Sequence, residues 1–216
     1  MKKIEKNIDL KEIEKKTWRS TLQDGILDIY FGILILGIGM GMTLSHILPD
    51  PLDMIIVAIF LGIGLTFFIL GKKYITQPRL GFVKFGFQQK ARKIKTIIIL
   101  SINFIAILII NLIRFANPDS ILRFPGYLDG LILGLLFITA PLFFVAYILH
   151  YPRLYFYAIL FGISFFLSEL LAIFISEPFD TLITFSIIAG IVIFLGVIFL
   201  IKFVRKYPLP KEEMAE

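Results

Sequence analysis

One carboxylate lies inside an apolar stretch that is long enough to cross a bilayer. The stretch covers residues 154–176, and Glu169 is its only charged residue. A helix needs about 20 apolar residues to cross about 30 Å of hydrocarbon. An ionised carboxylate near its middle costs about 2.5–3.5 kcal/mol, so we expect Glu169 to be protonated, paired or turned toward a polar interior. It either handles a proton or cation in a transport pathway or fixes helix packing as a neutral, hydrogen-bonded acid.

Small residues share the helical face of Glu169, which favours an orientation toward the protein interior. At about 100° per residue, Ala158, Gly162 and Ala172 fall on this face, and Ser168 lies on an adjacent stripe. Small residues on one face permit close contacts between helices in membranes. We therefore predict that Glu169 and Ser168 face the inside of a helical bundle.

Other polar residues extend this predicted interior. Asp24 and Asp28 lie one turn apart at the start of the first apolar run, where they could gather cations or stabilise the positive end of a helix. Asn103 and Asn111 lie on one side of another apolar run, and buried amides need partners. We predict an ion or solute pathway lined by Glu169, Asp28, Asp24, Asn103, Asn111 and Ser168.

The composition is that of a polytopic membrane protein. Of the 216 residues, 58% are hydrophobic and 18% are charged, and the mean hydropathy is +0.89. A soluble domain has about a quarter charged residues and no apolar runs of about 20. We predict an all-α helical bundle, with a six-helix transmembrane domain at residues 23–204 and spans at about 26–47, 54–70, 96–113, 128–149, 154–175 and 182–204.

Charge on the flanking segments predicts the orientation of the bundle. Residues 1–22 are rich in Lys and fit a short amphipathic helix at the interface, with Trp18 at headgroup depth, or a solvated helix. All but two of the 22 Lys and Arg residues fall on the same side of the six spans. The positive-inside rule then makes both termini cytoplasmic, including the tail at 205–216, in the cytoplasmic membrane.

The loop at 71–95 interleaves phenylalanines with basic residues. Phenylalanines in a short juxtamembrane loop fit the bilayer interface better than nucleic acid, so we expect no nucleic-acid partner. We predict contacts with anionic lipid headgroups, or with a protein partner, at Arg79, Lys84, Arg92, Lys93 and Trp18. That partner could be a second copy of the chain or another membrane protein.

Recognisable catalytic and metal-binding patterns are lacking. The chain has no cysteine and two histidines, which excludes thiolate and histidine-rich metal sites. It contains no zinc-protease, nucleophile-elbow or P-loop motif. Asp24-Gly25 with Asp28 matches part of the aspartate signature of membrane CDP-alcohol phosphotransferases, but its basic and later aspartate positions are missing. We therefore expect no enzyme activity, cofactor or metal.

Two motifs carry a resemblance. The segment Gln23-Asp-Gly-Ile-Leu-Asp-Ile-Tyr-Phe-Gly32 and the segment Pro78-Arg-Leu-Gly-Phe-Val-Lys-Phe85 resemble those of a loosely defined group of bacterial and archaeal multi-pass membrane proteins of unknown function. The resemblance covers the first two spans and the loop after them, and it implies no activity. The Asp-Gly pairs at 24–25 and 129–130 suggest a 3+3 inverted repeat, a plan common in transporters.

These observations predict two functions. The first is transport or permeation of an ion or small solute with Glu169 as the titrating group, so that Glu169→Gln abolishes pH-dependent flux. The alternative is an assembly or lipid-binding protein whose basic cytoplasmic face recruits a partner or anionic lipid. A polar cavity that reaches Glu169 favours the first function, whereas a dry bundle filled with phenylalanine favours the second.

Overall fold

The computed structural model describes residues 22–49, 51–80, 87–116 and 127–209. These residues form helices and turns, without a strand among them. In chain order the elements are α2 (Ile26–Ile47), α3 (Leu52–Gly71), the π-helical turn η1 (Lys72–Thr76), α4 (Gln77–Leu80), α5 (Phe87–Ala116), α6 (Tyr127–Leu133), the π-helical turn η2 (Gly134–Thr139), α7 (Ala140–Leu149), α8 (Arg153–Leu171) and α9 (Phe179–Lys206).

Six helical rods in the described residues are long and apolar enough to cross a membrane. They cover Ile26–Ile47, Leu52–Leu80, Ala91–Arg114, Leu128–Leu149, Arg153–Leu171 and Phe179–Lys206. The prediction of an all-helical chain with six such helices is confirmed, and it supports a multi-pass integral membrane protein. The inverted repeat and the orientation of the termini stay predictions.

Three rods differ from their expected bounds. The third rod, α5, begins at Phe87 rather than near residue 96. The second rod continues through η1 and α4 to Leu80, because a wider π-helical turn extends the helix into the polar segment after Gly71. The fifth rod, α8, ends at Leu171 rather than near residue 175. Its last turn tightens, with the Ile173 N–H donating to the Leu170 carbonyl at 3.3 Å, before the chain reverses into α9.

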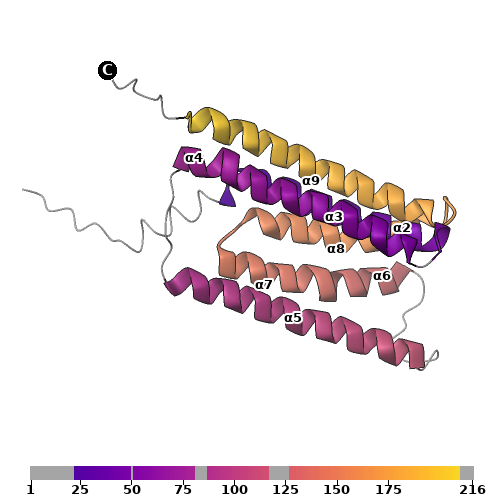
Figure 1. Cartoon of the computed structure of the whole chain (residues 1–216). Helices are drawn as coiled ribbons and strands as arrows, with labels where there is room; N and C mark the ends of the chain where they lie inside the picture. The colour runs from indigo at the N-terminus through magenta and orange to yellow at the C-terminus, as the bar shows by residue number, and fades with distance from the viewer. Residues whose placement is uncertain (1–21, 50, 81–86, 117–126, 210–216) are drawn as a thin grey trace, which may run out of the picture.

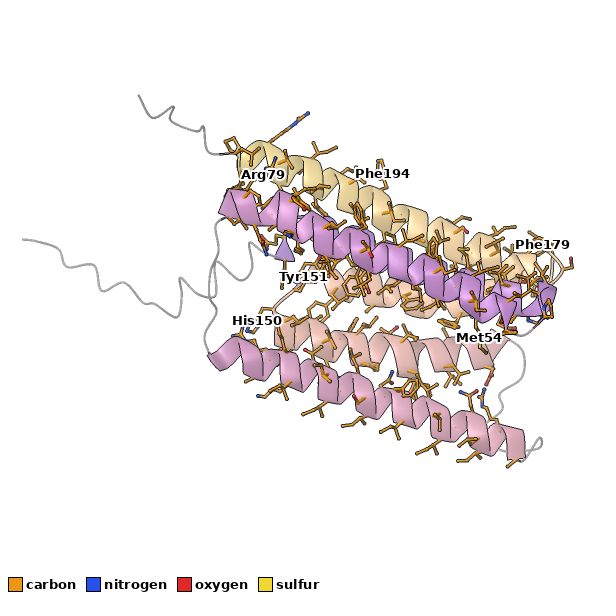
Figure 2. The ribbon with its side chains drawn as sticks, in the orientation of Figure 1. Met54, Arg79, His150, Tyr151, Phe179 and Phe194 are labelled. Carbon is orange, nitrogen blue, oxygen red and sulfur yellow. The ribbon has the colours of Figure 1, made fainter. Side chains whose placement is uncertain are left out.

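The rods lie side by side (Figure 1). Their two ends carry side chains of different charge. One end, which we call the basic end, carries Lys72, Arg153 and Lys206. The opposite end, which we call the acidic end, carries Asp129 and Asp180 at the starts of α6 and α9. In Figure 2 the basic end is marked by Arg79 and Tyr151, and the acidic end by Met54 and Phe179.

Helices α2 and α9 share the most extensive contact in the described part of the bundle, and their backbones approach closely. Gly25, which has a φ of 83°, begins α2, and a Cβ atom at this position would lie 2.4 Å from the Gly196 carbonyl oxygen. A side chain at Gly196 would meet the Ile29 backbone N at 2.7 Å. Small residues of this kind let helices approach in lipid, where the hydrophobic effect does not drive them together.

Helix α5 lies at the outer edge of the bundle and packs mainly on α7 (Figure 1). Two polar contacts fix it there. Asn103 Nδ2 donates to the Phe137 carbonyl oxygen at 3.0 Å, and Arg114 forms a two-pronged ion pair with Asp129 at 2.6 and 3.0 Å. Pro141 has no N–H, so the carbonyl groups one turn before it lack a helical donor, and Asn103 supplies one.

Candidate functional site

Asp24 is fully buried at the basic end, between α2 and the π-helical turn η1. Its carboxylate accepts hydrogen bonds from the Lys72 ammonium at 2.6 Å, from the Ile26 N–H at 3.1 Å and from the Thr76 hydroxyl. The turn η1 presents Lys72 and Thr76 to the same carboxylate. Asp24 therefore joins the first and second rods at the basic end.

Asp28, also fully buried, joins the first rod to the start of the fifth. Arg153 Nη1 donates to its Oδ2 at 2.9 Å, and the Tyr151 hydroxyl donates to its Oδ1. The Arg153 guanidinium also stacks on Phe199 of α9, 3.5 Å from the ring centre. A buried carboxylate is tolerated when its oxygens are paired in this way.

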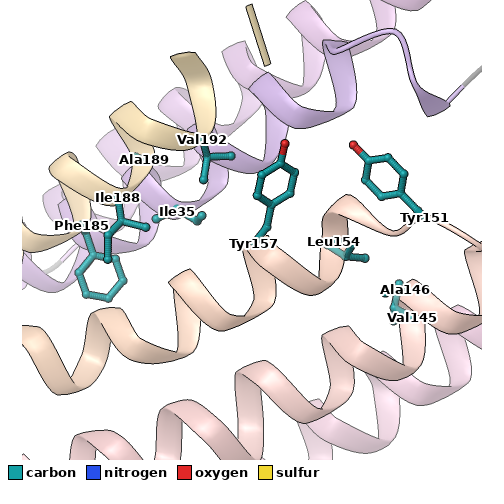
Figure 3. Close-up of a cluster of buried hydrophobic side chains, with 10 residues drawn as sticks. All are labelled: Ile35, Val145, Ala146, Tyr151, Leu154, Tyr157, Phe185, Ile188, Ala189 and Val192. Carbon is teal, nitrogen blue, oxygen red and sulfur yellow. The ribbon is translucent and has the colours of Figure 1, made fainter. Parts of the chain in front are cut away.

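The Tyr151 hydroxyl is a fixed donor to Asp28. Burial, and after it the negative charge of Asp28, raises the pKa of Tyr151 above its ordinary value, so the phenol stays protonated. The Tyr157 ring lies beside it, and both hydroxyls point toward α2 (Figure 3). The Tyr157 hydroxyl is buried close to Asp28, although it forms no hydrogen bond of standard geometry with a described residue. The basic end is thus closed by a compact polar cluster.

The acidic end opens into a pocket of about 310 Å³, which we call the acidic pocket. It lies between the end of α2, the start of α6, the end of α8 and the start of α9. Four carboxylates and an imidazole share its lining with small, polar and apolar side chains. The lining residues are Met42, His46, Asp129, Gly130, Leu133, Phe165, Ser168, Glu169, Glu177, Pro178, Asp180 and Thr181.

Asp180 is the least exposed carboxylate of this pocket. The side chain is 3% exposed, and its Oδ2 accepts hydrogen bonds from Ser168 at 3.0 Å and from Thr181 at 3.1 Å. Its Oδ1 is buried without a hydrogen-bond partner among the described residues. A buried, unpaired carboxylate oxygen is costly. Asp180 is therefore well suited to pair with a cation or proton donor in the pocket.

An apolar layer separates the acidic pocket from the polar cluster at the basic end. Phe165 lines the pocket, and its ring packs against Phe185 at 5.2 Å and against Phe161 at 5.9 Å between ring centres. Phe185, Ile35 and Val192 then follow in order along the bundle toward Tyr157 and Tyr151 (Figure 3). The two polar ends are thus separated by tightly packed side chains.

The predicted pathway residues do not lie together. Asp24 and Asp28 lie at the basic end, whereas Glu169 and Ser168 lie at the acidic pocket. Glu169 sits in the last turn of α8 and is exposed, which differs from the expected position deep in a longer helix. Positions 153 and 169 are separated by about 24 Å of helix rise, so Asp28 and Glu169 are not neighbours.

The two asparagines do not share one interior. Asn103 bonds to η2 across the helix interface, as described above. Asn111 is exposed, and its Nδ2 donates to the Ile107 carbonyl of its own helix at 2.9 Å. It borders a separate apolar pocket of about 190 Å³ between α5 and Leu133, Phe137 and Phe165. A single polar interior lined by Asp28, Asn103, Asn111 and Glu169 is therefore not formed.

The predicted headgroup contacts are described only in part. Arg79 Nη1 donates to the Ile75 carbonyl at 2.9 Å, which holds the side chain against its own helix. Arg92 is half-buried and Lys93 is exposed at the start of α5. Trp18 and Lys84 lie outside the described residues.

Several residues of the two sites were not selected from the sequence. Lys72, Tyr151 and Arg153 pair with Asp24 and Asp28, but the spacing along the chain gives no sign of these contacts. Asp180 was not selected either. The available signal is that Asp180 lies two residues after Pro178, at the start of a long apolar run, because such a residue occupies the first turn of a helix.

In the described part of the chain, no three His, Asp or Glu side chains come together closely enough to ligate a metal ion. No protein-family model, curated protein or solved structure matches this sequence. The resemblance carried by residues 23–32 and 78–85 therefore stays a prediction. We therefore infer the function from the geometry of the acidic pocket and of the cluster at the basic end.

Proposed function

We propose that the protein is a small transporter or permeation protein for a cation or a small cationic solute, which it binds first in the acidic pocket. The observation that carries the proposal is Asp180, which lines this pocket and whose buried Oδ1 has no hydrogen-bond partner among the described residues. A positive group would complete the coordination of that oxygen and offset its burial.

The charge of the pocket supports a cationic ligand. Asp129 is paired with Arg114, but Glu169 and Glu177 form no ion pair with a described residue. With Asp180 they leave an excess of negative charge in a concave site with low-dielectric walls, which raises the local concentration of cations. Among the described lining residues, His46 alone has a basic side chain.

The size of the pocket supports a small ligand. A volume of about 310 Å³ is at the lower end of the range of small-molecule sites. The carboxylates are too far apart to form a compact metal-ligand set in the described residues. The expected ligand is therefore a hydrated monovalent ion, a proton carrier such as hydronium, or an organic ammonium.

The closed basic end supports alternating access. Paired carboxylates at the basic end and phenylalanines packed edge to face in the middle close the bundle between the acidic pocket and the basic end. Movement across the membrane then requires the phenylalanine layer to open and the pairs at Asp24 or Asp28 to loosen. Following the positive-inside rule, we place the acidic pocket on the outer side and both termini in the cytoplasm.

The test is flux into proteoliposomes, measured for H⁺, Na⁺, K⁺ and methylammonium. We expect Asp180→Asn to lower the flux of the transported cation at least about tenfold, because a charge-assisted contact contributes about 1.5–3 kcal/mol. The amide keeps an oxygen to accept from Ser168 and Thr181, so the fold should survive.

Asp53→Asn is the matched control. Asp53 is 6% exposed at the start of α3, and it too has a buried oxygen without a hydrogen-bond partner among the described residues. It does not line the acidic pocket. Equal losses of flux in the two variants would show that the flux depends on buried carboxylates in general and not on the acidic pocket. If the parent protein carried no flux of any of the four cations, the proposal would be contradicted.

A further inference from the structure

A second concave site lies at the basic end, far from the acidic pocket and independent of its function. This cavity of about 240 Å³, which we call the basic pocket, is bounded by Arg153 at the start of α8 and by the last two turns of α9. Gln23, just before α2, and Tyr207, just after α9, complete its lining. Its lining consists of Gln23, Arg153, Phe199, Lys202, Phe203, Lys206 and Tyr207. Three of these seven residues are cationic and none is acidic.

Only one of the three cations is neutralised by a described carboxylate. Arg153 pairs with the buried Asp28 at 2.9 Å and lies over Phe199, so its guanidinium is held in a fixed position on the wall. Lys202 and Lys206 are exposed and form no ion pair with a described residue. Among the described residues, the basic pocket therefore carries a positive charge without a countercharge, beside a guanidinium held in place.

The spacing of the two lysines strengthens this imbalance. Residues four apart lie next to each other on a helix, and like charges in that arrangement repel. An anion between Lys202 and Lys206 would relieve the repulsion and gain two charge-assisted contacts. The favourable position of lysines near the carboxyl end of a helix explains their presence, but not their convergence with Arg153 and Gln23 on one cavity.

The donors and the walls indicate the chemistry of the anion. Lysine ammonium groups, the Gln23 amide and the free N–H groups of a guanidinium are donors that suit the several oxygens of a phosphate. The opposite wall is aromatic, with Phe203 and Tyr207 packed 5.2 Å apart between ring centres. This wall offers contact area to carbon atoms attached to the phosphate.

We infer that the basic pocket binds a phosphate group, as a monoester or diester, between Lys202, Lys206 and Arg153. The phosphate belongs either to a lipid whose acyl chains lie along α9 or to a soluble phosphate compound. These residues differ from the predicted headgroup contacts at Arg79, Arg92 and Lys93, which do not line this cavity.

The experiment uses the full chain, delipidated in a non-ionic detergent, and native mass spectrometry with added phosphatidic acid or diacylglycerol. These two lipids differ only in the phosphate. We expect the parent protein to retain phosphatidic acid and not diacylglycerol. The double variant K202Q/K206Q should bind phosphatidic acid at least tenfold more weakly. Arg153 is left intact, because its loss would also leave Asp28 unpaired.

The matched control is K73Q/R205Q, which removes the same charge from the same end of the bundle. Lys73 and Arg205 are exposed and do not line the basic pocket. We expect this variant to bind like the parent protein. Equal weakening in both double variants, or none in K202Q/K206Q, would overturn the inference, since the lipid would then be held by general surface charge or elsewhere.

Competition identifies the source of the phosphate. If inorganic phosphate at millimolar concentration displaces phosphatidic acid from the parent protein, the phosphate group alone is recognised and a soluble compound is sufficient. If it does not displace the lipid while K202Q/K206Q still loses binding, the site requires the acyl chains as well. Both results support a phosphate site. A parent protein that retains diacylglycerol as well as phosphatidic acid would contradict it.

Discussion

Replacement of Lys72 by Met tests the ion pair that joins the first and second rods. Asp24 is fully buried and lies 2.6 Å from the Lys72 ammonium, whose side chain is 20% exposed. Methionine keeps much of the apolar stem of lysine but removes the charge. The carboxylate then retains the Thr76 hydroxyl and the Ile26 N–H, and it loses its counter-ion.

The expected cost follows from the burial of the remaining charge. Removing one partner of a buried ion pair destabilises a protein by about 3–5 kcal/mol. Because two hydrogen bonds to Asp24 survive, we expect the lower end of this range, about 3 kcal/mol. For a chain of this size, that corresponds to a decrease in Tm of about 6–12 °C.

The assay is unfolding in mixed detergent micelles, followed by the loss of helical circular dichroism. Lys73→Met is the control, because Lys73 is adjacent, exposed and placed over the Tyr74 ring, without a contact to Asp24. In K72M, the second substitution Asp24→Asn should recover at least half of the lost stability, since it removes the unpaired charge. Equal stability of K72M and K73M, or no recovery in the double variant, would refute the reasoning.

Two further variants test the packing of the bundle by the same assay. Gly196→Ala should lower the free energy of unfolding by about 1–3 kcal/mol, because the new methyl group would meet the adjacent helix. Gly190→Ala on the same helix should be nearly neutral, since nothing lies within 4 Å of its Cβ position. Equal effects would contradict the close α2–α9 contact. Asn103→Leu should lower the free energy of unfolding by about 1 kcal/mol, because it leaves the Phe137 carbonyl unpaired. Adding Pro141→Ala should reduce that loss by restoring a backbone N–H. A loss that the second substitution does not change would count against this pairing.

The spanning helices were predictable from the sequence because lipid imposes a simple requirement. Every backbone polar group in hydrocarbon must be bonded within the segment, so a run of about 20 apolar residues becomes a helix whatever its neighbours are. The six runs therefore appear in the structure as six apolar helices. The turn at η1 was not predictable, since the second rod continues into a segment rich in lysine that hydropathy alone assigns to a loop.

The position of Glu169 shows why helix length is not enough to place a site. The apolar run continues to residue 176, but α8 ends at Leu171 and the remaining residues form the turn into α9. Glu169 therefore moves from the middle of a span to the rim of a pocket. A hydropathy average does not detect a turn made of Ile173, Phe174 and Ile175, because these residues are equally apolar in a helix and in a turn.

The contacts of Asp24 and Asp28 were unpredictable for a different reason. Their partners come from the second rod and from the turn before the fifth, and no local pattern connects them. What composition did indicate is that buried carboxylates in an apolar chain require partners. The sequence therefore predicts that such pairs exist, whereas the choice of Lys72 and Arg153 depends on how the helices pack.

The buried carboxylates differ in how fully they are paired, and this difference assigns their roles. Asp24 and Asp28 each combine a cation with hydroxyl or backbone donors, so an incoming ligand would have to displace a partner. Asp180 has only hydroxyl donors on one oxygen, and its other oxygen has no partner in the described residues. A cation therefore gains most at Asp180, and the pairs at the basic end act as a closed gate that a bound cation must loosen.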